Sequence, residues 1–228
     1  MFQEAFLGTR VSFTRTDSKK AEGYLAQPAK ENAPGVVVIQ EWWGLAGNIT
    51  ALCDRLALAG YAALAPDLYG GKLVPYHDHK AAEAELQKLD FADAAQNSVR
   101  GAAQYLKRSA PKVGVVGFCM GGAVAMLAAA APEISAVAPF YGLPPEKFLD
   151  ISKLKIPVQG HFSNTDDFVT PSRADGFEAA LKSSKVQHEI FRYDASHAFM
   201  NEQRDVYDRA AAELAWGRLL GFFKLHLA

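Results

Sequence analysis

The sequence predicts an α/β fold with a mostly parallel central sheet and helices on both faces. Residues 35–39 and 113–116 are apolar runs without alternation, which is typical of strands covered on both faces. Such strands alternate with helical segments along most of the chain, and this alternation implies right-handed crossovers between parallel strands. The 228 residues, half of them hydrophobic, show no repeat or long linker, so we expect one domain over residues 1–228.

Each element is predicted from a local pattern. Residues 11–15 and 23–27 are two strands of a hairpin, with residues 17–20 as its turn. The other expected strands are short apolar runs, at residues 35–39, 61–65, 113–116, 135–140, 157–162 and 187–193. The expected helices have helical spacing or small side chains, at residues 48–59, 80–109 with a break near Asp90, 122–131, 174–182 and 206–227. Asn48 is a suitable N-cap for the first of these helices, and Gly60 follows its end.

The charge balance and the cysteine count exclude several classes of protein. The chain has 24 basic and 25 acidic residues, a net charge of −1, so nothing in its charge favours nucleic acid or a membrane as a partner. Residues 1–15 lack a basic segment followed by an apolar one, and no apolar run reaches the roughly 18 residues of a membrane span. Two cysteines in a chain this long are not a disulfide framework. We expect a cytoplasmic monomer that acts on a small molecule.

The segment Gly117-Phe118-Cys119-Met120-Gly121 lies between an expected strand and an expected helix. This is the context of the G-x-S-x-G nucleophile elbow, with Cys in place of Ser. At the start of a helix, unpaired N–H groups favour negative charge, which suits a thiolate and a developing oxyanion. Gly-rich strand-to-helix turns also occur in nucleotide-binding folds, and a buried Cys is often a small hydrophobe. The G-x-G-x-x-G spacing of a dinucleotide site is absent, however.

Two further residues complete a candidate triad in the chain order of α/β-hydrolases, nucleophile, acid and histidine. His197 lies in a short loop just past an expected strand, where it can act as base and then as acid. Asp166 can hold the imidazole in the required tautomer and offset its charge. Asp166 and the adjacent Asp167 are alternatives, because either can instead cap the following helix.

Glu41 follows the strand at residues 35–39, so its position at the strand end matches those of Cys119, Asp166 and His197. Ligands of open parallel sheets bind at the carboxyl ends of the strands, which places all four on one face. A carboxylate near a thiol disfavours the thiolate, so Glu41 either keeps Cys119 neutral or accepts its proton; a solvent-exposed Glu is the third reading. The expected oxyanion donors are the backbone amides of Met120 and Trp42.

Metal binding is not expected. His77-Asp78-His79 can present two imidazoles, but no third or fourth ligand is evident nearby. Cys53 lies next to Leu52 inside an expected helix and is read as packed core. We therefore expect neither a metal nor an organic cofactor.

These residues together resemble the dienelactone hydrolase family of α/β-hydrolases. The matching segments run in order along nearly the whole chain, as Gln40-Glu41-Trp42-Trp43-Gly44, Ala65-Pro66-Asp67-Leu68-Tyr69, Gly117-Phe118-Cys119-Met120-Gly121-Gly122, Asp166-Asp167-Phe168-Val169 and Ala195-Ser196-His197-Ala198-Phe199. The resemblance implies an α/β-hydrolase fold, with Cys119 as nucleophile and Asp166 and His197 completing the triad. It also implies that Glu41 is the carboxylate that contacts and gates the thiol.

Two positions depart from the dienelactone-cleaving members of that family. Those members carry an Arg shortly after the Leu-Tyr pair and another Arg four residues after the catalytic His, and both help to bind a substrate carboxylate. Here Lys72 is the cation nearest to the first position, and it lacks a bidentate fork. Asn201 occupies the second position, where it can hydrogen-bond Glu41 but not neutralise it. These departures argue against dienelactone itself as the natural substrate.

The sequence thus predicts hydrolysis of a lactone or small ester through an acyl-thioester on Cys119. Tyr141, in a loop after a strand, is an expected pocket residue together with Lys72 and Asn201. One alternative is a thioesterase or another carboxylesterase that uses the same residues. The other is a non-catalytic binding or redox-sensing protein on a hydrolase fold, since fold alone does not fix function.

Overall fold

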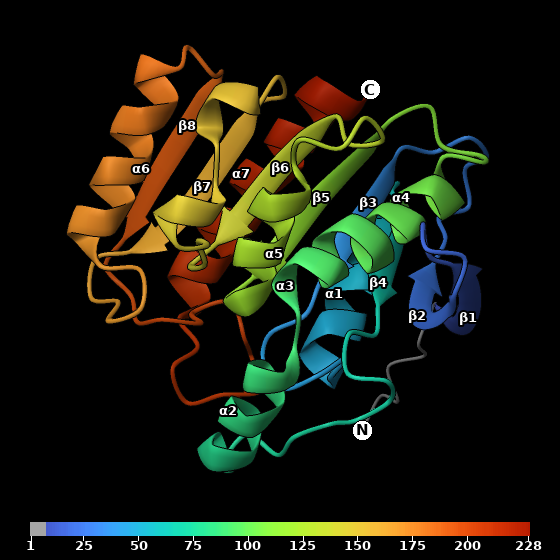
Figure 1. Cartoon of the computed structure of the whole chain (residues 1–228), viewed down its shortest axis with the longest axis horizontal. Helices are drawn as coiled ribbons and strands as arrows, with labels where there is room; N and C mark the ends of the chain where they lie inside the picture. The colour runs from blue at the N-terminus through green and yellow to red at the C-terminus, as the bar shows by residue number, and fades with distance from the viewer. Residues whose placement is uncertain (1–7) are drawn as a thin grey trace.

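The computed structural model describes residues 8–228 and contains one eight-stranded sheet in the order β1–β2–β4–β3–β5–β6–β7–β8 (Figure 1). The strands are β1 Thr9–Thr14, β2 Lys20–Ala26, β3 Gly35–Ile39, β4 Ala62–Pro66, β5 Val113–Phe118, β6 Ala136–Phe140, β7 Val158–Ser163 and β8 His188–Tyr193. Only the pairs β1–β2 and β2–β4 are antiparallel. The predicted α/β fold with a mostly parallel sheet is therefore confirmed.

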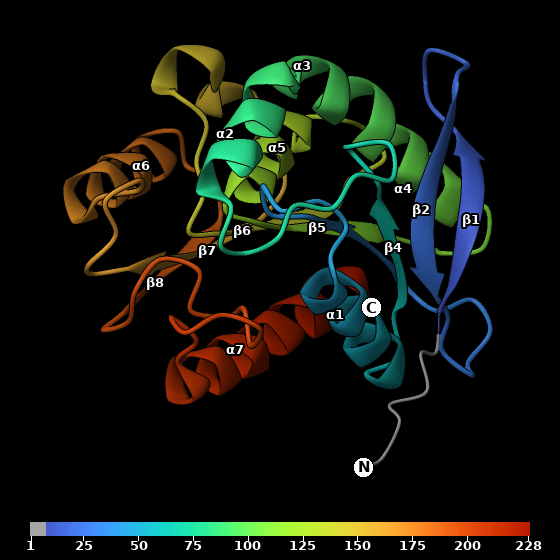
Figure 2. The ribbon, with the colours of Figure 1, turned by 90° about the horizontal axis from the view of Figure 1, so that it is seen from below.

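Helices cover both faces of this sheet, with α1 and α7 on one face and α4, α5 and α6 on the other (Figure 2). The α-helices are α1 Gly47–Leu58, α2 His79–Lys88, α3 Phe91–Asp93, α4 Arg100–Leu106, α5 Met120–Ala128, α6 Pro171–Ser183 and α7 Arg209–Leu227. The short 3-10 helices η2 Glu146–Phe148 and η3 Ile151–Lys153 precede β7. None of the helices in residues 8–228 has both the length and the apolar character needed to cross a bilayer.

The central strands are apolar along their whole length because each of their faces packs against helices. All residues of β3 and β5 are buried. Val37 and Ile39 belong to the core that includes Met126 of α5, whereas Val36 and Val38 belong to the core that includes residues of α1 and α7. Successive side chains of a strand point to opposite faces, so one β-branched run supplies both cores.

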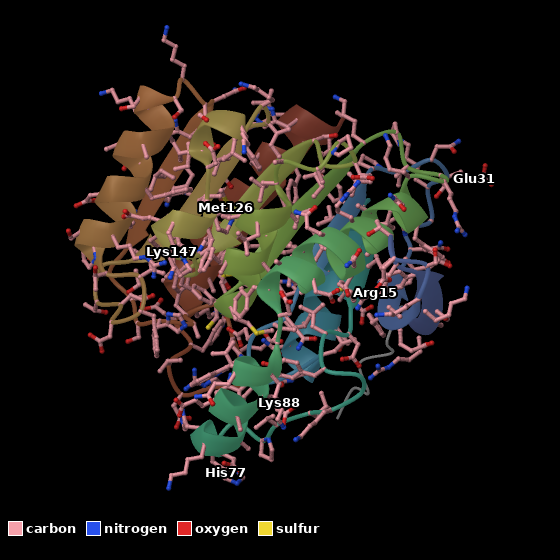
Figure 3. All side chains as sticks on the ribbon, viewed as in Figure 1. Arg15, Glu31, His77, Lys88, Met126 and Lys147 are labelled. Carbon is pink, nitrogen blue, oxygen red and sulfur yellow. The ribbon has the colours of Figure 1, made fainter. Side chains whose placement is uncertain are left out.

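The segment expected to be mostly helical at residues 80–109 is divided into four pieces. The break predicted near Asp90 is confirmed: α2 ends at Lys88, and Asp90 caps α3 by accepting a hydrogen bond from the Asp93 amide at 3.0 Å. A π-helical turn, η1 Ala94–Val99, which the periodicity did not predict, joins α3 to α4. Figure 3 shows His77 at the tip of the end of the molecule that α2 forms and Lys88 closer to the sheet, whereas Met126 of α5 is buried.

The expected helix starts differ from the structure by one to three residues, and two of them concern the capping residue. Asn48 is not an N-cap, because α1 begins at Gly47 after Ala46 and Asn48 is buried inside the helix. The final helix begins at Arg209 instead of residue 206, because the Asp208 side chain accepts a hydrogen bond from the Ala211 amide at 2.9 Å and caps it there. At α7 a capping side chain sets the start, whereas α1 begins after Ala46 with no side-chain cap.

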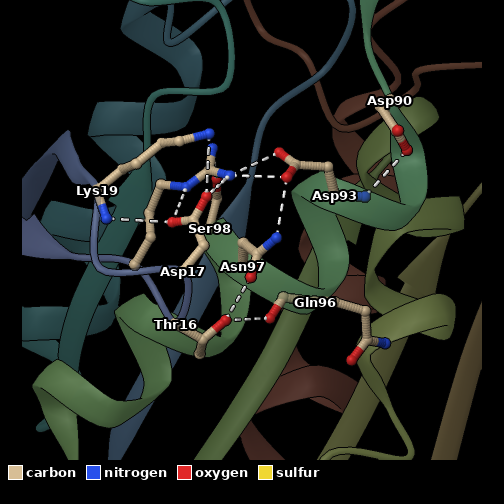
Figure 4. Close-up of polar contacts among 9 residues, drawn as sticks. Thr16, Asp17, Lys19, Asp90, Asp93, Gln96, Asn97 and Ser98 are labelled. Carbon is tan, nitrogen blue, oxygen red and sulfur yellow. Dashed lines mark hydrogen bonds and ion pairs between the residues drawn. The ribbon is translucent and has the colours of Figure 1, made fainter.

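The β1–β2 hairpin is tied to the helical layer by polar contacts at its turn (Figure 4). Arg15 pairs with Asp17 at 2.8 Å and with Asp93 at 2.7 Å. The Thr16 hydroxyl lies 2.7 Å from the Gln96 carbonyl oxygen in the π-helical turn. Charge-assisted pairs that are partly shielded from water are stronger than exposed ones, so these contacts hold the antiparallel edge of the sheet against the helices.

Candidate active site

Cys119 stands between the last residue of β5 and the first residue of α5, at the carboxyl end of a central strand. Its backbone has a φ of 55°, a left-handed conformation that is rare for a residue with a Cβ. Tyr141 (φ 37°) and Ala198 (φ 65°) have the same uncommon sign. All three line one cavity, and each such conformation costs about 1–3 kcal/mol. Strain of this kind is concentrated at functional sites.

The glycines that flank Cys119 are required by the close approach of neighbouring backbone. A Cβ on Gly121 would lie 2.4 Å from the carbonyl oxygen of Ile39 and 2.5 Å from that of Gln40. A Cβ on Gly117 would lie 2.0 Å from the carbonyl oxygen of Gly121. The turn after β5 is therefore pressed against the end of β3, and this contact brings Cys119 close to the loop that carries Glu41.

His197 and Asp166 meet although β8 and a helix separate them in the chain. The Nδ1 atom of His197 lies 2.7 Å from Oδ2 of Asp166, whose side chain is fully buried. The other carboxylate oxygen accepts hydrogen bonds from the amides of Phe168 at 2.7 Å and Val169 at 3.1 Å. Asp166 is thus held on its own loop and orients the imidazole, whereas the neighbouring Asp167 is exposed at the cavity.

The imidazole of His197 favours its protonated form. Burial lowers the pKa of His197, but the hydrogen bond to Asp166 and the interaction with Cys119 outweigh burial and raise that pKa from 6.5 to about 10. Cys119 and His197 line the same cavity, so the charge on one is felt by the other. A protonated imidazole beside sulfur is a suitable acid for a leaving group.

Glu41 is buried and is surrounded by neutral hydrogen-bond donors. Asn201 donates to its Oε2 atom at 2.5 Å, Asn48 donates to the same atom at 3.3 Å, and Tyr141 donates to Oε1 at 3.2 Å. Burial raises the pKa of Glu41 above its usual value, and Asn201, His197 and Arg204 oppose that rise. The carboxyl group is therefore easier to protonate than an exposed one.

Two backbone amides close to Cys119 in the chain or in the fold make no hydrogen bond to the part of the protein that the structure describes. Within residues 8–228, neither the Met120 amide nor the Trp42 amide donates a hydrogen bond to another protein atom. Met120 is the first residue of α5, where helix N–H groups lack intrahelical acceptors. Trp42 follows Glu41 in the loop that contacts the turn around Cys119.

These residues surround a cavity of about 510 Å³. Its lining is mostly apolar and aromatic, and it includes Trp42, Trp43, Leu86, Phe91, Met120, Ala123, Leu143, Pro145, Phe168, Val169 and Val206. The polar groups in the lining include Glu41, Cys119 and His197. A largely apolar cavity with a few convergent polar groups is the usual form of a small-molecule site.

The three expected substrate-binding residues are placed differently. Tyr141 lines the cavity and is almost fully buried. Asn201 is also buried, but its amide is used by Glu41 and it does not line the cavity. Lys72 lies outside the cavity lining, and its ammonium group pairs with Glu85 at 2.5 Å.

Sequence reasoning missed most of the cavity lining, and three of the missed residues make contacts that shape the site. Arg204 follows Asn201 by three residues, and its guanidinium lies 5.3 Å from the centre of the Trp43 ring. Arg173 donates to the carbonyl oxygens of Phe168, Leu143 and Pro144 at 2.7–3.0 Å and so holds two loops of the rim together. The Phe168 ring lies 4.9 Å from the His197 ring. Of these three residues, only Phe168 could have been found from the sequence, because it belongs to the motif that contains Asp166.

The part of the chain that the structure describes contains no group of three or more His, Cys, Asp or Glu side chains arranged to hold a metal ion. The segment considered for metal binding has other contacts. Asp78 caps α2 by accepting a hydrogen bond from the Ala81 amide at 3.0 Å, and the His79 ring packs edge-on against Trp43 at 5.4 Å.

Comparison with known proteins identifies relatives over almost the whole chain. A family model described as the dienelactone hydrolase family matches residues 21–227. The chain is 37% identical to Protein usf of Aquifex pyrophilus over 238 residues, which cover 97% of this chain and all of the relative. It is 35% identical over 232 residues to a provisionally named carboxymethylenebutenolidase of Aquifex aeolicus, again covering 97% of this chain and all of the relative.

Solved structures show the same architecture. A crystal structure of a provisionally named dienelactone hydrolase from Klebsiella pneumoniae superposes with a TM-score of 0.84 at 27% identity, covering 95% of this chain and 98% of the other. The dienelactone hydrolase-like promiscuous phosphotriesterase P91, from metagenomic libraries, superposes with a TM-score of 0.77 at 21% identity. That superposition covers 97% of this chain and all of P91. The fold is the α/β-hydrolase fold.

Proposed function

Because the chain belongs to the dienelactone hydrolase family, we propose that it hydrolyses a lactone or small ester through an acyl-thioester on Cys119. The observation that carries the proposal is the contact between His197 Nδ1 and Asp166 Oδ2 at 2.7 Å, at the cavity that Cys119 lines. An imidazole held in this way has its second nitrogen free to exchange a proton with a nucleophile. The raised pKa of His197, to which Cys119 contributes, supports the same pairing.

The first half of the reaction transfers the acyl group to sulfur. His197 holds the thiol proton while the Cys119 thiolate attacks the carbonyl carbon, and Asp166 keeps the imidazolium oriented. Negative charge develops on the carbonyl oxygen, which the amides of Trp42 and Met120 stabilise. Removing one such donor in other enzymes costs about 3 kcal/mol. The imidazolium then gives its proton to the leaving oxygen, and the acyl-thioester remains.

The second half releases the acid. His197, now neutral, takes a proton from a water molecule that attacks the thioester, and sulfur leaves as the thiolate. Glu41 tunes the charge of that sulfur. A carboxylate and a thiolate in one small cavity repel each other, and burial makes the Glu41 carboxyl easier to protonate. The raised pKa of Glu41 therefore lets the carboxyl lose its charge while sulfur carries one.

The test compares the two cysteines of the chain. Cys119→Ala should lower kcat/KM for p-nitrophenyl acetate and for a simple lactone by at least about a thousandfold, because the nucleophile is lost. Cys53→Ala is the control, since Cys53 is buried in α1 away from the cavity and should keep kcat/KM within about twofold. Mass spectrometry during turnover should find one acyl group, on Cys119.

Two results would count against the proposal. Full activity of the Cys119→Ala protein would remove the nucleophile assignment. A wild-type protein that hydrolyses no ester, thioester or lactone, while its Cys119 thiol oxidises readily, would instead identify a redox-sensing thiol on a hydrolase fold. Turnover of thioesters alone would identify a thioesterase that uses the same residues.

A further inference from the structure

We propose that the substrate carries a bulky, uncharged, apolar acyl group, which is held by Leu86, Phe91 and Ala123. This inference rests on the proposed function and extends it to the substrate class. The cavity volume of about 510 Å³ gives the first reason. Pockets that hold drug-sized ligands have volumes of about 300–1,000 Å³, so this cavity has room for a ligand of that size. A small lactone ring would leave much of that apolar space unfilled.

The direction of the acyl group follows from the two faces of the sheet. His197 must protonate the leaving group, so the leaving group lies on the His197 side of Cys119. The residues next to His197, Ala198 and Phe199, belong to the core on the α1 and α7 face of the sheet, whereas Phe91 packs against the core on the α5 face, where Figure 2 shows α2 and α3. The acyl group is therefore directed away from His197, toward the part of the cavity formed by α2, α3 and the first turn of α5.

The last turn of α2, α3 and the first turn of α5 line that part of the cavity with hydrocarbon side chains, and His79, at the start of α2, packs its ring edge-on against Trp42 and Trp43. Leu86 comes from the last turn of α2, Phe91 from α3 and Ala123 from the first turn of α5, and all three line the cavity. Figure 1 shows α2 and α3 near the end of α5 at which the carboxyl ends of the strands lie. An apolar wall of this kind gains free energy only from apolar surface that leaves water.

The cations near this wall are engaged elsewhere. The guanidinium of Arg173 donates hydrogen bonds to three backbone carbonyl oxygens at the rim of the cavity. Lys72 pairs with Glu85 outside the cavity. Arg204 reaches the cavity from the segment after β8, where its guanidinium lies over Trp43 and interacts electrostatically with Glu41. An acyl carboxylate on the α2–α3 side would lose its hydration without gaining a charged partner, so a charged acyl group is disfavoured there.

The experiment uses p-nitrophenyl esters that share a leaving group and differ in the acyl group. For the wild-type protein, kcat/KM should rise from acetate through butyrate to octanoate and 4-phenylbutyrate. Each buried methylene is worth about a factor of three to four. The hemiglutarate ester, similar in length to valerate but anionic, should be at least about tenfold poorer than valerate.

Two variants locate the acyl wall. Leu86→Ser should lower kcat/KM for octanoate by about tenfold and leave acetate within about twofold, because only the long chain reaches α2. Ala123→Leu should also lower kcat/KM for octanoate more than for acetate, because the larger side chain fills the space that the long acyl chain would occupy. This substitution keeps the wall apolar. Leu214→Ser is the matched control, since Leu214 is an exposed leucine of α7 outside the cavity lining.

The outcomes separate this inference from the proposed function. A flat or falling series from acetate to octanoate, or a preference for hemiglutarate, would overturn the apolar acyl pocket while Cys119-dependent hydrolysis stands. A rising series that Leu86→Ser and Ala123→Leu leave unchanged would overturn the assignment of the wall. Failure of every ester in the series, with acetate included, would reject the proposed function together with the inference.

Discussion

Glu41 is the side chain whose surroundings differ most from those of an ordinary carboxylate. It is 1% exposed and accepts hydrogen bonds from two asparagines and a tyrosine. The cationic groups of His197 and Arg204 act on it only through electrostatic attraction. Neutral donors provide hydrogen bonds to its oxygen atoms, but these bonds offset only part of the free energy lost when a charge is buried. The residue therefore stores unfavourable free energy at the site, as functional residues often do.

Replacing Glu41 by Gln should stabilise the protein. The folded-state pKa of Glu41 is raised, so the folded state holds this proton more tightly and loses stability as pH rises above about 4.5. The amide keeps an acceptor for both asparagines, and the Tyr141 hydroxyl can turn to accept from its NH₂ group. We expect the Glu41→Gln protein to be about 1 kcal/mol more stable at pH 7 and to show altered ester turnover.

Urea unfolding of both proteins at pH 4 and pH 7 checks this expectation. The stabilisation should be smaller at pH 4, where the wild-type carboxyl is closer to neutral. Glu41→Ala is the control, because it removes the same charge but also removes atoms from a packed site, so it should destabilise. Equal stability of wild type and Glu41→Gln at both pH values would show that the buried charge carries no cost.

At the level of elements, the site depends on the contact between the end of β3 and the start of α5. Gly121 is the point of closest approach, because the carbonyl oxygens of Ile39 and Gln40 occupy the place that a Cβ would take. Both obstacles are backbone atoms, which move only if a strand moves. The same contact sets the spacing between Cys119 and the amide of Trp42, so packing and chemistry are coupled at this position.

Gly121→Ala should therefore cost both stability and activity. The extra methyl group forces β3 and α5 apart, for which we expect a loss of about 3 kcal/mol and a kcat reduced by at least about tenfold. Gly217→Ala is the matched control, because Gly217 lies inside α7 with open space at its Cβ position and should gain about 1 kcal/mol. Thermal melting and ester turnover measure both effects. Wild-type stability of Gly121→Ala would contradict the proposed packing.

At the scale of the whole molecule, the strands gather side chains that lie far apart in the chain. Cys119, Asp166 and His197 follow β5, β7 and β8, and a loop after β8 carries His197 back to the cavity. The charge state of His197 therefore depends on Asp166, which follows β7, and on Cys119, which follows β5. Its contribution to stability belongs to the folded chain alone, because unfolding separates the imidazole from Asp166 and Cys119.

The stability of the protein should therefore fall with rising pH in a defined window. The folded-state pKa of His197, about 10, lies above the ordinary value of 6.5, so its stabilisation is complete below about pH 6.5 and is lost as pH rises toward 10. His197→Gln should lack this loss. Urea unfolding at pH 6, 8 and 10 measures the difference between the two proteins. A difference that does not change with pH would show that His197 has an ordinary pKa.

Local patterns were sufficient for much of this protein. The unalternating runs and the strand–helix alternation predicted the sheet, and Gly117 and Gly121 marked the tight turn around Cys119. The break at Asp90 was visible because a capping side chain acts on amides within its own turn. The prediction of Asn48 as an N-cap was wrong because its local chemistry is that of a cap, whereas the fold buries its side chain beside Glu41.

The sequence by itself determined the fold class, the turn that carries Cys119 and the order of the candidate triad, because backbone conformation and hydrophobic period are properties of neighbouring residues. Only the tertiary structure decided that Asp166 rather than Asp167 contacts His197, that Lys72 pairs with Glu85, and that Arg204 lies over Trp43. It also decided the size and the apolar character of the cavity. Such pairings depend on distances across strands and on exclusion from water, which exist only after the chain has folded.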